Sequence, residues 1–225
     1  MYAIKRAAVI GAGTMGLGIA GQLANAGIEV LLLDVAADGD NRDAVAERAL
    51  ERLLDKNQPG LLHEDYLKRI SIGNIEDDMQ RLSDVDWIAE AVVEQLDIKK
   101  SLYKQIDAVR KDGCIVSSNT STIPISLLVE DMPQAFREEF AITHFFNPVR
   151  FMRLLEIVRG EHRCDAGHRR FRALAVLGIV PKLHGDFVAD GTAVVDIESV
   201  AAIDDTEPCI RDVLGLRALQ RGDPE

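Results

Sequence analysis

The sequence has few cysteines, fewer bases than acids and no long apolar run, and each shortage excludes classes of protein. The three cysteines, Cys114, Cys164 and Cys209, are odd in number and lack metal-ligand spacing, so we expect a reducing compartment and no metal site. The 26 bases against 37 acids give a formal net charge of -11, which disfavours a nucleic-acid partner because phosphates require a basic face. An anionic cofactor is still compatible with this charge, since it needs only a local patch of positive potential.

No stretch approaches the roughly 18 consecutive apolar residues of a membrane span, so we expect no membrane partner. The apolar run at residues 7–10 is too short for a signal peptide and continues directly into glycines. These two observations, together with the cysteine content, predict a cytoplasmic location.

A strand–helix–strand unit opens the chain. Residues 7–10 are apolar and end at a glycine, which indicates a buried parallel strand. Small and apolar residues recur at helical spacing over residues 14–26, and Gly27 suits the end of that helix. Residues 29–34 read as a second buried strand, and the unit of about 30 residues has the size of a parallel crossover.

Strand and helix patterns continue to alternate after this unit. Further strands are expected at residues 70–72, 87–94, 113–119, 140–146 and 154–158, and further helices at 43–56, 97–109 and from 125. Such alternation predicts an α/β fold: a Rossmann-type, doubly wound, mostly parallel sheet with helices on both faces. We place this domain at residues 1–185 and a short irregular tail at 186–225, in which 187–197 is β-prone. Helices are conceivable at residues 169–177 and 208–219.

The turn between the first strand and the first helix has the pattern of a dinucleotide site. Gly11 permits a tight turn, Gly13 lets the backbone approach a pyrophosphate, and Gly16 lets the helix lie close to the strand. Thr14 and Met15 open the helix, whose free N–H groups favour an anion. Asp34 ends the second strand, where a carboxylate binds the adenosine ribose and repels a 2′-phosphate, which favours NAD over NADP. The alternative is a glycine-rich turn of an unrelated α/β protein, with Asp34 an ordinary strand-end acid.

Polar segments follow three later strands. They are residues 118–121 (Ser-Asn-Thr-Ser), residues 144–148 (His-Phe-Phe-Asn-Pro) and Glu156, and the strand ends of an open α/β sheet are where ligands bind. Oxidation of an alcohol requires a base, and the pKa of histidine suits that task. Glu156 lies within an apolar run and needs a partner if buried; His144 would supply one, and the carboxylate would then orient the imidazole. The alternative for His144 is a hydrogen-bonded histidine of the core.

Five segments, in order and spacing, resemble the 3-hydroxyacyl-CoA dehydrogenase family. They are residues 11–20 (GAGTMGLGIA), 90–94 (EAVVE), 118–121 (SNTS), 144–148 (HFFNP) and 155–158 (LEIV). The resemblance extends from about residue 4 to residue 160. The HFFNP segment is the most specific of the five, because many unrelated dehydrogenases share the glycine turn.

The resemblance implies a role for each matching residue. His144 would be the general base, with Glu156 as its orienting partner. Ser121 and Asn147 would hold the substrate oxygen and the nicotinamide end, and Glu94 and Lys99 would contact the cofactor. The implied reaction is the reversible NAD-dependent oxidation of a (3S)-hydroxyacyl-CoA to the 3-ketoacyl-CoA.

Three of these side chains also have a purely structural alternative. Ser121 could be the N-cap of the next helix, Glu94 a helix-start acid and Lys99 a solvated lysine.

The C-terminal part departs from the family pattern. Family members continue with a helical domain that closes over the acyl-CoA and commonly forms a dimer, whereas the residues after Arg163 do not have that pattern. The family's Asp-Thr-Pro-Gly-Phe turn has only a partial counterpart at residues 185–191, and residues 163–172 are suddenly rich in arginine. One hypothesis is a disrupted reading frame, with impaired catalysis and a missing dimer interface. Two other functions therefore stay open: a catalytically silent NAD-binding or interaction protein, and another NAD-linked hydroxy-acid dehydrogenase, such as the 3-hydroxyisobutyrate type.

Overall fold

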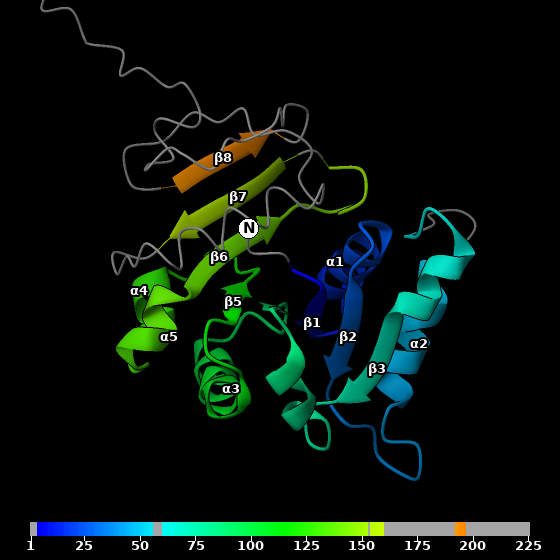
Figure 1. The fold of residues 1–225 in the computed structure, drawn as a ribbon, viewed down its shortest axis with the longest axis horizontal. Coiled ribbons are helices and arrows are strands. Elements are labelled where there is room, and N and C mark those ends of the chain that lie inside the picture. Colours follow the sequence, from blue (N-terminus) through cyan, green and yellow to red (C-terminus); the bar gives the residue numbers. More distant parts are fainter. Residues whose placement is uncertain (1–3, 56–59, 153, 160–191, 197–225) are drawn as a thin grey trace, which may run out of the picture.

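The strands in the described part of the chain form one sheet. The computed structural model describes residues 4–55, 60–152, 154–159 and 192–196. Within them an eight-stranded sheet has the order β3-β2-β1-β4-β5-β6-β7-β8 (Figure 1). The strands are β1 Arg6–Ile10, β2 Glu29–Asp34, β3 Ile70–Asn74, β4 Trp87–Glu90, β5 Ile115–Ser118, β6 Phe140–Phe145, β7 Leu154–Arg159 and β8 Thr192–Asp196. Strands β1 to β6 pair in parallel, and β7 and β8 add an antiparallel edge.

Helices cover both faces of the sheet. One apolar cluster joins the sheet to α1 Thr14–Asn25, α2 Ala44–Leu53 and the 3-10 helix η1 Glu64–Arg69. The other joins it to α3 Leu96–Val109, α4 Ile125–Val129, α5 Gln134–Glu138 and the 3-10 helix η2 Met79–Asp84. Successive residues of β1 alternate between the clusters, because side chains of a strand alternate between the two faces: Val9 belongs to the first cluster and Ile10 to the second. Double coverage explains why this strand reads as a continuous apolar run.

The predicted fold class is confirmed, whereas several element boundaries and part of the tail differ from the expectation. Strand β4 stops at Glu90 rather than at residue 94, because the N–H of Val92 bonds to the Glu90 carboxylate instead of a neighbouring strand. Helix α2 ends at Leu53 rather than at residue 56, and β6 ends at Phe145 rather than at residue 146. Strand β8 lies in the predicted tail, which is therefore not irregular at residues 192–196: the segment pairs with β7 in the same sheet.

Several expectations fall outside the described residues: the helices at 169–177 and 208–219, the arginine-rich segment, the partial family turn at 185–191, and Cys164 and Cys209. The proposed boundary between residues 185 and 186 stays a prediction. No helix in the described part of the chain is long and apolar enough to cross a membrane.

Candidate functional site: a dinucleotide turn facing a histidine–carboxylate pair

The glycine turn joins β1 to α1 in a conformation that requires glycine at two positions. Gly11 has φ of +104°, and a Cβ there would lie 2.6 Å from the carbonyl oxygen of Ala91. A Cβ on Gly16 would lie 1.7 Å from the carbonyl oxygen of Gly11, so α1 can approach the turn only with glycine at that position. Gly13 differs from both, because a Cβ there would meet nothing within 4 Å. The open face of Gly13 and the uncapped start of α1 fit a pyrophosphate at this turn.

Asp34 connects the end of β2 to the same turn. One carboxylate oxygen accepts the N–H of Ala12 at 2.5 Å and the other accepts the N–H of Val35 at 2.6 Å. The carboxylate is half-buried, and each oxygen retains lone pairs for a further donor such as a ribose hydroxyl. The geometry is therefore compatible with the predicted ribose contact.

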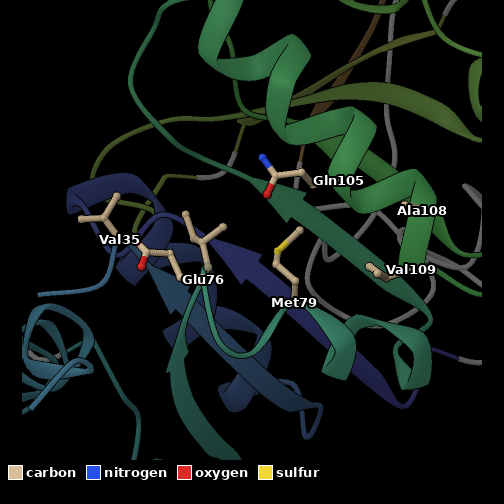
Figure 2. Close-up of a pocket in the computed structure, with 7 residues that line it drawn as sticks. Val35, Glu76, Met79, Gln105, Ala108 and Val109 are labelled. Carbon is tan, nitrogen blue, oxygen red and sulfur yellow. The ribbon is translucent and has the colours of Figure 1, made fainter.

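An apolar crevice lies next to Asp34 on the α3 side of the sheet. It has a volume of about 520 Å³ and is lined by Val35, Ile75, Glu76, Met79, Gln105, Ala108 and Val109 (Figure 2). Val35 follows Asp34 directly in the sequence, so the crevice lies next to the predicted ribose contact. The short helix η2 is the only helix of the crossover between β3 and β4, which leaves this face of β2 and β3 thinly covered.

His144 and Glu156 form a hydrogen-bonded pair. They are direct register partners in the antiparallel ladder of β6 and β7, and the distance from His144 Nδ1 to Glu156 Oε2 is 2.8 Å. In the neutral tautomer that this contact favours, Nδ1–H donates to the carboxylate and Nε2 keeps the lone pair of a base. The side chains are 21% and 33% exposed, so a ligand can reach them. His144 is thus accessible at the surface of a cleft, unlike a histidine closed within the core.

The cleft beside His144 collects most of the residues expected at the site. It has a volume of about 310 Å³, and its lining includes Met15, Glu94, Lys99, Ser121, His144 and Asn147. Ser121 and Asn147 are exposed. Asn119, which also lines the cleft, accepts the N–H of Phe145 at 2.8 Å and so joins the end of β5 to the end of β6. Residues from five separate segments therefore meet at the carboxyl ends of the parallel strands.

Glu94 holds the turn that contains Ser121. Its Oε1 atom accepts hydrogen bonds from the hydroxyl groups of Thr120 and Thr122 and, at 3.3 Å, from the N–H of Ser121. Burial raises the pKa of Glu94, but the bond from Thr120, the charge of Lys99 and the bond from Thr122 outweigh it and lower the pKa below its usual value. The alternative for Ser121 is wrong, because the N-cap of α4 is Pro124 and no side chain caps it.

A buried charge network lies behind this wall of the cleft, and the sequence reasoning missed most of it. Glu90 is fully buried at the end of β4, and Lys99 is 1% exposed rather than solvated. Burial, and then the charge of Glu90, raise the pKa of Tyr103, whose hydroxyl donates to Glu90. The available signal was an acid ending the otherwise apolar run of residues 87–90, with Lys99 and Tyr103 one helical turn apart on α3.

The site combines a glycine turn, an acid at the end of β2 and a histidine–carboxylate pair above the same strand ends. Together these features define the NAD-binding domain of a dehydrogenase. The chain belongs to the 3-hydroxyacyl-CoA dehydrogenase family, since the family's NAD binding domain matches residues 6–176.

Curated relatives and solved structures are similar over the same region. A probable 3-hydroxyacyl-CoA dehydrogenase of Deinococcus radiodurans is 46% identical over 156 residues, which cover 69% of this chain and 45% of the relative. A protein of the same description from Bacillus subtilis is 41% identical over 170 residues, covering 69% of this chain and 22% of the relative. The chain thus spans less than half the length of these two relatives.

The structure of 3-hydroxybutyryl-CoA dehydrogenase from Escherichia coli superposes with a TM-score of 0.66 at 31% identity, covering 79% of this chain and 37% of that one. The structure of (S)-3-hydroxybutyryl-CoA dehydrogenase PaaH1 from Ralstonia eutropha gives a TM-score of 0.63 at 33% identity, covering 78% and 61%.

Proposed function

We propose that the protein catalyses the reversible NAD-dependent oxidation of a (3S)-hydroxyacyl-CoA to the 3-ketoacyl-CoA, a step of fatty-acid or related CoA-thioester catabolism. The observation that carries the proposal is the hydrogen-bonded His144–Glu156 pair, of which His144 lines one cleft together with Met15 of the glycine turn. A base and a dinucleotide turn that share a cleft suit the removal of a proton and a hydride from neighbouring atoms of one alcohol. The names of the relatives supply the CoA-thioester class of substrate.

In the proposed mechanism, the Nε2 atom of His144 removes the proton of the substrate hydroxyl. Bound NAD would supply the acceptor for the hydride on the carbon that carries this hydroxyl, so that the C–O bond becomes a carbonyl. Glu156 holds the ring through Nδ1 at 2.8 Å and stabilises the imidazolium that forms. In the reverse direction the imidazolium returns the proton to the carbonyl oxygen.

The other predicted site residues would position the two ligands. The pyrophosphate would be held by the turn at Gly11, Gly13 and Gly16 and by the N–H groups of Thr14 and Met15. Asp34 would hold the adenosine ribose. The crevice beside Val35 would shelter the flat, apolar adenine ring from water. Ser121 and Asn147, which are exposed at the cleft, would hold the substrate oxygen and the nicotinamide end.

A second candidate function is cofactor binding without turnover. The exposure of Ser121 and Asn147 favours it, because a cleft open to water loses the electrostatic advantage of a dry site. A hydroxy-acid dehydrogenase of the 3-hydroxyisobutyrate type has less support, since that group typically relies on a lysine whereas this cleft presents His144, which is paired with Glu156. A homodimer and a cytoplasmic location stay predictions.

The test is NADH oxidation by the purified protein with acetoacetyl-CoA, compared with the His144→Gln variant. Turnover that disappears in the variant supports the dehydrogenase. Absence of turnover with intact NADH binding would support the silent alternative, and turnover with a simple hydroxy acid but not with a CoA thioester would overturn the assigned substrate class.

A further inference from the structure

Glu90 is a fully buried carboxylate with four hydrogen-bond donors. Oε1 accepts the N–H of Val92 at 2.8 Å and the ammonium of Lys99 at 2.6 Å. Oε2 accepts the hydroxyl of Tyr103 at 2.7 Å and that of Ser118 at 2.6 Å. A buried charge is tolerated only when it is paired and hydrogen-bonded, and Glu90 meets both conditions. The donors come from α3, from β5 and from the segment after β4, so the carboxylate joins three parts of the chain behind the cleft.

Lys99 connects Glu90 to the surface of the cleft. Its ammonium lies 2.6 Å from Glu90 and 3.4 Å from Oε2 of Glu94. The other oxygen of Glu94 accepts the hydroxyl groups of Thr120 and Thr122 in the turn before α4. The chain of contacts therefore runs from a fully buried acid, through a buried lysine, to a partly exposed acid and the cleft-lining turn.

We propose that Glu90 is a positioning residue of the cofactor cleft: it holds the Lys99 ammonium in place, and Lys99 holds Glu94 against the turn at residues 120–122. This inference rests on the proposed cofactor site. Glu90 itself does not line the cleft, whereas Glu94, Lys99 and Ser121 do. Lys99 acts mainly through Glu94, since Glu90 and Glu94 already occupy its ammonium.

The first arm of the test is NADH affinity, measured by fluorescence titration, in two variants. Glu90→Gln keeps Lys99 but removes its buried counter-ion, and we expect the Kd to rise about tenfold because the lysine no longer has a fixed position. The double variant Glu90→Gln/Lys99→Met removes both charges at nearly constant volume. We expect its melting temperature to be close to that of the wild type and its Kd to stay about tenfold higher.

The second arm asks whether the effect passes through Glu94. If it does, adding the Glu90→Gln/Lys99→Met pair to a Glu94→Gln variant should change the Kd little. The three changes together should then raise the Kd about tenfold, whereas two independent effects of about tenfold each would multiply to about a hundredfold. Additive effects would show that Lys99 contacts the cofactor independently and would overturn the inference.

A matched control separates positioning from stability. Arg110 and Glu139 form another ion pair of low exposure, just beyond the opposite end of α3. The Arg110→Met/Glu139→Gln variant should leave NADH affinity unchanged whatever it does to the melting temperature.

Equal loss of affinity in this control, or wild-type affinity in the Glu90→Gln/Lys99→Met variant, would reduce the network to a structural role and overturn the proposal. Failure of the wild-type protein to bind NADH would remove the proposed cofactor site, and this inference with it.

Discussion

The two sides of the cleft are constructed in different ways. The nucleotide side consists mainly of backbone from one contiguous unit, residues 11–34, in which glycines set the approach of α1 and Asp34 bonds to the turn. The side with His144 consists of side chains from the segments after β4 and β5 and from β6 and the residues after it, with Glu156 of β7 behind His144, and these meet only in the folded sheet. Substitutions on the nucleotide side should therefore disrupt binding through local steric change. Substitutions on the side with His144 should act through the loss of individual hydrogen bonds and charges.

The largest expected effect is on the backbone side. A Gly16→Ala change places a Cβ 1.7 Å from the carbonyl oxygen of Gly11, so the turn must move. We expect the free energy of unfolding to fall by about 3 kcal/mol and NADH binding to be lost, as urea unfolding and fluorescence titration would show. Gly13→Ala is the matched control: its Cβ meets nothing within 4 Å, so the variant should fold normally and lose only NADH affinity. Normal NADH binding by Gly16→Ala would refute the steric account.

The second effect concerns the histidine pair. His144→Gln should lower the turnover of acetoacetyl-CoA by about a thousandfold, since the general base is removed, while the Kd of NADH changes little. Glu156→Gln keeps a hydrogen-bond acceptor for Nδ1 but loses the charge that stabilises the imidazolium, so we expect a smaller loss of about a hundredfold. Single-turnover measurements check both values, and equal turnover in Glu156→Gln and the wild type would contradict the role of Glu156.

The third effect is on cofactor choice. Asp34→Asn removes the charge that would repel a 2′-phosphate, and we expect the preference for NADH over NADPH to fall by about tenfold. The ratio of the two Kd values is the measurement, with the melting temperature as a control for the turn that Asp34 supports through Ala12. A preference that does not change would indicate that Asp34 is an ordinary strand-end acid.

The smallest effect is expected at the crevice of Figure 2. Ala108 is exposed on α3 and lines the crevice, so Ala108→Trp should fill it without disturbing the core. We expect the Kd of NADH to rise about fivefold and that of reduced nicotinamide mononucleotide, which lacks adenosine, to stay unchanged. Ser101→Trp, on the exposed surface of the same helix, is the control. If both ligands or both variants respond alike, adenine does not use the crevice.

Sequence reasoning was most successful where function depends on residues that are close together in the sequence. The β1–α1–β2 unit and its glycines followed from local patterns, because backbone conformation at a tight turn restricts which residues fit. It was less successful for Glu90 and Glu94: both acids are visible in the segment EAVVE, but the pattern does not show that β4 stops at the first of them. Residues 187–197 were recognised as β-prone, but the pairing of β8 with β7 was not predicted, since it depends on a partner more than thirty residues away.

From the sequence one could derive the α/β class, the NAD turn and the pairing of His144 with Glu156, because periodicity, glycine spacing and a lone acid in an apolar run are local signals. The tertiary structure decided what those signals could not. Antiparallel register placed Glu156 opposite His144, and the closure of the cleft wall buried Lys99 between Glu90 and Glu94. The reason is physical: register and burial are set by contacts between segments distant in sequence, and the charge state and orientation of a side chain depend on those contacts.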